Sequence, residues 1–198
     1  MPTPPGSTRE MTAASLLAAL LVVCSIVVVP VPTGPVPITL QVFVVILAAL
    51  LLSPRWAGTA VGVYLLLGAA GVPVFAGATG GLGVILGPLG GYLIGFAAGA
   101  MIGATVRQIL EGRKVPSVLS DGAAAAATVV VIYVVGVTQL WLVTNLGPSG
   151  LSVVQAILVG AAPFILVDIG KAVVAVLVAQ ALRRTGVLPR GAAASRPA

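Results

Sequence analysis

Long apolar runs, interrupted by clusters of proline and glycine, dominate the pattern of hydrophobic and polar positions along the chain. No charged residue occurs in residues 11–54, 56–106 or 122–167. Each run exceeds the roughly 20 residues that one helix needs to cross a bilayer, so each can cross more than once. Divided at the proline and glycine clusters, the runs predict an all-α, polytopic integral membrane protein. The six expected membrane-spanning helices cover residues 12–29, 37–53, 57–71, 87–107, 122–143 and 163–183.

The last expected helix has the clearest beginning, because Pro163 suits the first turn of a helix. From Pro163 to Arg183 such a helix is about 30 Å long, which is one hydrocarbon thickness. Residues 151–162 then form a short external or re-entrant segment. Asp168 and Lys171 lie about 7 Å and about 12 Å below the outer end of this helix, in the outer half of the membrane.

The composition agrees with a membrane protein. Hydrophobic residues make up 59% of the chain and charged residues 7%, against roughly 25% charged residues in soluble domains. The net charge is +6, but the basic residues do not gather on an amphipathic face. We therefore expect the lipid bilayer, and no nucleic acid, as a partner.

The basic residues alternate between the two sides of the predicted membrane. All except Lys171 fall in the tails or in the second and fourth connections: Arg9, Arg55, Arg107, Arg113, Lys114, Arg183, Arg184, Arg190 and Arg196. By the positive-inside rule, both termini are expected in the cytoplasm. Residues 1–11 and 184–198 are then cytoplasmic tails, and residues 12–183 form one transmembrane domain.

Several kinds of chemistry are excluded by the sequence. It contains no histidine, and Cys24 is its single cysteine, so a histidine base, an intramolecular disulfide and a cysteine-rich metal site are ruled out. The Gly170-Lys171 dipeptide lacks the earlier glycine and the following Ser or Thr of a phosphate-binding loop. Ser149 lies in a G-x-S-G pattern, as in rhomboid proteases, but has no histidine to activate it. We expect no catalytic site, metal or cofactor, and no enzyme.

The connections on the opposite face carry no charge. The first is residues 30–35, and the last runs over residues 144–162. The second contains eight glycines, at positions 71, 77, 80, 81, 83, 87, 90 and 91. Glycine permits tight turns and close backbone approach, which would suit a lid over a ligand. The alternative role for these glycines is close helix packing in lipid.

Asp168 and Lys171 are the candidate chemical groups. An ionised side chain in the middle of a span costs about 2.5–3.5 kcal/mol on insertion scales. The two residues share a helix face, but such a pair returns only about 0.2–0.5 kcal/mol on an isolated helix. They are therefore expected to face the bundle interior, where other helices, water or a ligand complete their bonds. A structural ion pair is the alternative.

The first expected helix carries a face of small residues. Ala14 and Ala18 form a small-xxx-small pair, which allows another helix to approach closely. The partner helix can belong to this chain or to another protein.

Three segments together resemble the BioY family, the biotin-specific S-components of energy-coupling-factor (ECF) vitamin transporters. They are VPITLQ (36–41), LLLGAAGVPVFAGATGGLGVILGPLGGYLIGF (65–96) and PFILVDIGKA (163–172). The resemblance covers about residues 13–185. Leu166-Val167 replaces a Pro-Gly found in many relatives, and Thr79 stands near a position where some have Asn.

The resemblance implies a six-helix S-component in a bacterial plasma membrane that binds biotin from outside. It implies partnership with a coupling (T) subunit and two ATPase subunits. Asp168 and Lys171 would belong to the biotin site, and Ala14 and Ala18 would contact the coupling subunit. Further residues in segments expected to line or cover the site are Gln41, Phe75, Thr79, Gly80, Gly81 and Tyr92.

Biotin suits these side chains chemically. Asp168 could accept bonds from the ureido N–H groups, Lys171 could donate to a ligand oxygen, and Phe75 or Tyr92 could cover the rings. A self-sufficient secondary transporter, in which Asp168 and Lys171 couple proton and substrate movement, is the alternative function.

Overall fold

The computed structural model describes residues 5–26, 28–29, 36–147 and 150–185. Within them lie eight helices and a two-stranded antiparallel ribbon. The helices are α1 (Pro5–Ile26), α2 (Gln41–Leu51), α3 (Pro54–Ala69), α4 (Leu82–Leu86), α5 (Gly90–Gly112), α6 (Ser117–Asn145), α7 (Val153–Gly160) and α8 (Ala162–Arg184), and the strands are β1 (Val28–Val29) and β2 (Ile38–Thr39). The predictions for residues 30–35, Ser149, Arg190 and Arg196 lie outside the described residues.

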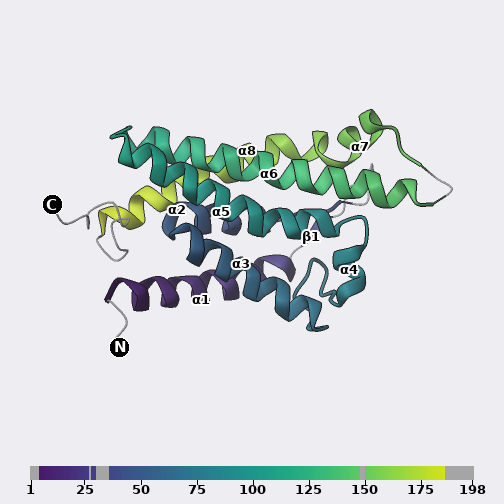
Figure 1. Cartoon of the computed structure of the whole chain (residues 1–198), viewed down its shortest axis with the longest axis horizontal. Coiled ribbons are helices and arrows are strands. Elements are labelled where there is room, and N and C mark those ends of the chain that lie inside the picture. Colours follow the sequence, from purple (N-terminus) through teal and green to yellow (C-terminus); the bar gives the residue numbers. More distant parts are fainter. Residues whose placement is uncertain (1–4, 27, 30–35, 148–149, 186–198) are drawn as a thin grey trace.

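The long helices run side by side in one bundle (Figure 1). Helix α1 begins and α8 ends at the same end of this bundle, and α4, α7 and β1 lie at the other. We call the two ends the arginine end and the loop end, because Arg107 and Arg183 lie at the first. Helix α6 packs between α5 and α8, and α2 contacts both α5 and α8.

Four of the described helices are long and apolar enough to cross a membrane: α1 over Thr8–Ile26, α5, α6 and α8. Helix α3 has 16 residues and α2 has 11. The structure thus supports a polytopic helical protein, whereas the count of six spans stays a prediction.

The boundaries of the first two expected spans were wrong. Residues 28–29 and 38–39 form β1 and β2, with Val28 paired to Thr39 and Val29 to Ile38, where both spans were predicted to be helical. The physical reason is the proline content of residues 30–37. Proline lacks an N–H and disfavours a helical conformation in the residue before it, so α1 ends at Ile26 and α2 begins only at Gln41.

Glycines on α5 bring α5 and α6 into close contact. A Cβ at Gly95 would lie 3.0 Å from the Ile132 Cα, and one at Gly99 would lie 2.8 Å from the Thr128 carbonyl oxygen. Any larger side chain would therefore push the helices apart. Among the eight glycines for which close packing was the alternative, Gly91 at the start of α5 has this role, because a Cβ there would meet the Val135 carbonyl oxygen at 2.6 Å.

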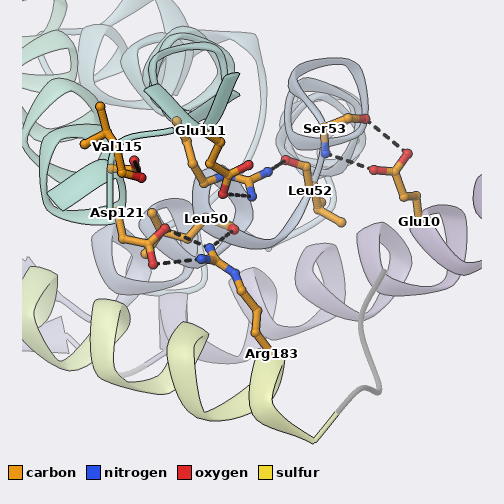
Figure 2. A network of polar contacts seen from close by, with 10 residues as sticks. Glu10, Leu50, Leu52, Ser53, Glu111, Val115, Asp121 and Arg183 are labelled. Atoms are coloured by element: carbon orange, nitrogen blue, oxygen red, sulfur yellow. Dashed lines mark hydrogen bonds and ion pairs between the residues drawn. The ribbon is translucent and has the colours of Figure 1, made fainter. Parts of the chain in front are cut away.

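Two arginines hold the carboxyl-terminal end of α2 (Figure 2). Arg183 donates to the Leu50 carbonyl oxygen at 2.7 Å and to both carboxylate oxygens of Asp121 at 2.8 Å. Arg107 donates to the Leu52 carbonyl oxygen at 3.0 Å. These carbonyls lack partners inside α2, so the guanidinium groups satisfy the helix end and oppose its partial negative charge.

Arg107 corrects a further prediction. The fourth span was expected to end there and to leave the arginine in a connection, but α5 continues to Gly112 and Arg107 is only 3% exposed. Its buried position follows from its bonds to Leu52 and, within α5, to Glu111 at 3.2 Å. These bonds satisfy the two terminal nitrogens of the guanidinium group, whereas its Nε has no hydrogen-bond partner among the described residues.

The predicted last helix is confirmed. Helix α8 begins at Ala162 with Pro163 in its first turn and ends at Arg184. The segment before it, predicted to be short and external or re-entrant, contains α7. Ser152 and Gln155 form a capping box at the start of α7, in which each side chain bonds the backbone N–H of the other residue.

Candidate ligand-binding site

Asp168 lies inside the bundle, lines a cavity and is 3% exposed. The Lys171 Nζ donates to its Oδ1 at 2.6 Å, and the Tyr133 hydroxyl of α6 donates to its Oδ2 at 2.6 Å. The expectation that α8 alone does not satisfy the carboxylate is therefore met, because a neighbouring helix supplies the second donor.

Tyr133 is the main site residue that the sequence analysis missed. Its partner Asp168 lies 35 positions further along the chain, so no local spacing connects them. One signal was present: tyrosines in membrane proteins gather at the interfaces, whereas Tyr133 lies in the middle of the predicted span 122–143.

The cavity is open at one side and holds about 760 Å³ of empty space, the open mouth included. Apolar and aromatic side chains form most of the wall. Its lining residues are Val36, Pro37, Ile38, Thr39, Gln41, Val42, Phe75, Ala76, Thr79, Val84, Leu89, Tyr92, Leu93, Phe96, Ile132, Tyr133, Phe164, Asp168 and Lys171.

Gln41, the first residue of α2, contributes a fixed amide to this wall. Its Nε2 donates to the Tyr64 hydroxyl of α3, and its Oε1 accepts from the Thr39 hydroxyl at 3.0 Å. Gln41 is 3% exposed. Both ends of the amide are therefore held before any ligand arrives, which presets its orientation.

The segment between α3 and α4 folds over the cavity as a short turn. Phe75 and Thr79 exchange backbone hydrogen bonds of 2.9 and 3.3 Å, and both line the cavity. The Phe75 ring meets Tyr64 edge-on, with centroids 5.5 Å apart. It also covers Gly68, where a Cβ would lie 2.0 Å from the ring. This segment is where a lid was predicted.

Gly80 and Gly81 shape that turn and are not among the residues that line the cavity. Gly81 has a φ of +97° and donates its N–H to the Gly68 carbonyl oxygen at 2.7 Å. A Cβ at Gly80 would lie 2.5 Å from the Val72 carbonyl oxygen. Both positions require glycine for the backbone path, so their predicted role is indirect.

Tyr92 lines the cavity with its ring and uses its hydroxyl elsewhere. The hydroxyl donates to the Gly160 carbonyl oxygen at the end of α7, at 2.8 Å. The ring packs on Gly136 of α6, where a Cβ would lie 2.4 Å from it. Tyr92 thus ties α5, α6 and α7 together at the wall.

The predicted small-residue face of α1 lies against α3. Ala14 and Ala18 are 3% and 8% exposed and line a groove between the two helices, together with Trp56, Ala60 and Val63. Packing within the chain therefore accounts for their burial. A contact with a coupling subunit stays a prediction.

The arrangement of the cavity suits a small amphipathic molecule. A carboxylate accepts hydrogen bonds, an ammonium group donates them, and a tyrosine hydroxyl and a glutamine amide lie in the same wall. Aromatic and aliphatic side chains surround these groups and can cover an apolar ring system.

Comparisons with known proteins agree on one family. The family model described as "BioY family" matches residues 1–187. The chain is 39% identical to the "Biotin transporter BioY" of Thermotoga maritima over 176 residues, which are 89% of this chain and 96% of that protein. It is 38% identical to the "Probable biotin transporter BioY" of Pyrococcus horikoshii, over 88% of this chain and 96% of that one.

The fold also matches a solved structure, described as the S-component for biotin from an ECF-type ABC transporter. The TM-score is 0.82 at 24% sequence identity, and the match covers 93% of this chain and 95% of that one. The described helices therefore have the S-component arrangement. With a family model that matches nearly the whole sequence and relatives aligned over nearly their full length, this chain belongs to the BioY family.

Proposed function

We propose that this protein captures biotin from outside the cell and moves it across the membrane as the substrate-binding S-component of an ECF-type transporter. The observation that carries the proposal is the cavity beside Asp168, in which charged and polar donors and acceptors converge inside an otherwise apolar wall. The names of the relatives supply the ligand, and the S-component fold supplies the kind of transporter.

The chemistry of biotin fits both the polar and the apolar part of the cavity wall. Its ureido ring has two N–H donors and a carbonyl acceptor, and its fused rings are largely apolar. Asp168 accepts from the ureido N–H groups, and Lys171 donates to a ligand oxygen. Phe75 and Tyr92 cover the rings, and Gln41 and Thr79 complete the wall. Gly80 and Gly81 act through the turn that carries Phe75 and Thr79.

We further propose that energy comes from separate subunits. The sequence has no ATP-binding motif, so a coupling subunit and two ATPase subunits would supply it. The groove that Ala14 and Ala18 line between α1 and α3 is the proposed place of contact for the coupling subunit, because small residues let a foreign helix approach closely. Both termini would then lie in the cytoplasm.

No observation favours the alternative of a self-sufficient secondary transporter. The chain has four acidic residues, and only Asp168 lies at the cavity. Glu10, Glu111 and Asp121 belong to the contacts at the arginine end (Figure 2). A relay of ionisable groups from the cavity through the membrane is therefore missing among these carboxylates.

Calorimetric titration of the purified protein with biotin tests the site. We expect Asp168→Asn and Lys171→Ala each to weaken biotin binding about 10- to 100-fold, because a hydrogen bond to a charged group contributes about 1.5–3 kcal/mol. Glu10→Gln is the matched control, since it removes a carboxylate at the arginine end, and its affinity should stay at the wild-type value. Wild-type affinity in both site variants would refute the site.

Uptake measurements test the transporter class separately. In cells that lack every ECF coupling and ATPase subunit, the protein should bind labelled biotin without accumulating it. Accumulation against a gradient in such cells would overturn the proposed dependence on an energising module, even if the binding site is correct.

A further inference from the structure

Helices α6 and α8 touch through polar side chains at two levels. At the arginine end Asp121 pairs with Arg183, and nearer the loop end Tyr133 bonds Asp168. The two α6 residues are 12 positions apart, about 18 Å along the helix. Between these levels the helices are separated by an apolar groove, which we call the α6–α8 groove.

Small side chains on both helices create the α6–α8 groove. Gly122 and Ala126 lie on the α6 side and Ala172 on the α8 side. Its rims are the exposed side chains of Val118 and Leu177, at 58% and 61%. The groove holds about 1080 Å³ of empty space, open space included.

The position of the groove determines what can fill it. Both helices are long and apolar enough to cross the membrane, so the groove faces hydrocarbon rather than water. Its length of about 18 Å matches one leaflet, which is half of a hydrocarbon core of about 30 Å. One extended acyl chain therefore fits along it.

Cations lie at the arginine end of both helices that form the groove. Arg184 is the last residue of α8, and Arg113 and Lys114 come just before α6. All three are exposed and form no ion pair with any other residue that the structure describes. Arg183, by contrast, is occupied by Asp121. Three available cations at the ends of the two helices that form an apolar groove favour a ligand with an anionic head and an apolar tail.

We propose that the α6–α8 groove is a binding site for one anionic phospholipid from the leaflet at the arginine end. One acyl chain lies in the groove between Gly122 and Ala172, and the phosphate lies on Arg113, Lys114 and Arg184. This site shares Asp168 with the wall of the proposed biotin cavity but lies on the outer side of the bundle, and it does not depend on the identity of the ligand in the cavity.

Native mass spectrometry of the purified protein tests this site, with palmitoyl-oleoyl phosphatidylglycerol and phosphatidylcholine as the probes. We expect one phosphatidylglycerol to remain bound to the wild-type protein and phosphatidylcholine to be retained more weakly. Neutralising Arg113, Lys114 and Arg184 to Gln should weaken phosphatidylglycerol binding about fivefold for each cation removed. Arg55→Gln is the matched charge control, because Arg55 is exposed at the start of α3, away from the groove.

A second pair of variants tests the acyl chain. Ala126→Phe and Val173→Phe each fill the groove, one from either helix, and both should abolish retention of the lipid. Val134→Phe is the control, since Val134 is a 61% exposed residue of α6 outside the groove. Because the two substitutions lie on different helices, a folding defect in one variant would not account for loss of the lipid in both.

Both parts of the lipid must contribute to binding if the proposal is correct. Displacement of the bound lipid by inorganic phosphate at millimolar concentration would show that only the head is recognised and would overturn the proposal. Equal retention of both lipids, an Arg55→Gln effect as large as that of the other charge variants, or full retention in both groove-filling variants would also overturn it.

Discussion

At the scale of single residues, Asp168 shows how a charge is kept inside an apolar bundle. Lys171 compensates its charge from one turn away on α8, and Tyr133 donates the second bond from α6. The position of Lys171 follows from the sequence, because residues three apart share a helix face. That of Tyr133 does not, because it depends on how α6 and α8 pack.

Two of the three tyrosines of the chain offer a test at this scale. Tyr133→Phe removes only the hydroxyl that holds Asp168, and we expect biotin binding to weaken about 2- to 10-fold, in line with a net hydrogen-bond contribution of about 0.5–1.5 kcal/mol. Tyr92→Phe is the comparison, because its hydroxyl bonds the Gly160 carbonyl instead. Tyr92→Phe should lower the melting temperature and leave the affinity for biotin nearly unchanged. If Tyr92→Phe weakened biotin binding more than Tyr133→Phe does, the role given to Tyr133 would be contradicted.

At the scale of elements, α2 links the two ends of the bundle. Its first residue, Gln41, lies in the wall of the cavity, and the carbonyls of its last turn are held by Arg183 and, just beyond it, Arg107. The hydrophobic pattern predicted a helix here but not its length of 11 residues. Prolines before α2 and the serine and proline after it limit its two ends. The first residues of the predicted span are extended rather than helical, and only the pairing of β1 with β2 reveals this.

Arg183 should contribute strongly to stability because Asp121 is fully buried. We expect Arg183→Met to lower the free energy of unfolding by about 3–5 kcal/mol, since it leaves an unpaired carboxylate inside the protein. Thermal unfolding of the purified protein measures the effect. Arg184→Met is the control one position along, and its exposed side chain should change stability by no more than about 0.5 kcal/mol. Equal melting temperatures for Arg183→Met and Arg184→Met would show that the pair of Arg183 and Asp121 contributes nothing to stability.

The contact between α5 and α6 allows a second test of an element. Gly99→Ala places a methyl group 2.8 Å from the Thr128 carbonyl oxygen and should destabilise the protein by about 1–3 kcal/mol through overpacking. Gly62→Ala on α3 meets nothing within 4 Å and should be neutral or stabilising by up to about 1 kcal/mol. The difference between their melting temperatures is the measurement, and a Gly99→Ala variant as stable as Gly62→Ala would contradict the packing argument.

At the scale of the whole molecule, helical content and the polar face of α8 could be predicted because both follow from local patterns. Hydrophobic runs set the helices, and the cost of charge in lipid places Asp168 inside. Contacts between distant segments could not be predicted. The burial of Arg107, the bond from Gln41 to Tyr64 and the groove between α6 and α8 each depend on packing that no spacing in the sequence encodes.

The orientation in the membrane is a prediction at this scale. Single cysteines introduced at Gly112, at the arginine end, and at Gly147, at the loop end, in a Cys24→Ala background report which end faces outward. A membrane-impermeant maleimide added to intact cells should label only the cysteine at position 147, because basic residues favour the cytoplasmic side. Labelling of position 112 alone would reverse the orientation and place the arginine end outside.

Asp168 belongs both to the cavity and to the α6–α8 groove. At this point a single side chain, that of Asp168, separates the cavity from the groove that faces the lipid. Micelles and bilayers fill the groove differently, and a detergent that leaves it partly hydrated lets water reach the carboxylate from behind. Water there competes for the carboxylate oxygens, so biotin affinity should be higher in lipid nanodiscs than in a short-chain detergent. The choice of solubilising medium is therefore itself an experimental variable for this protein.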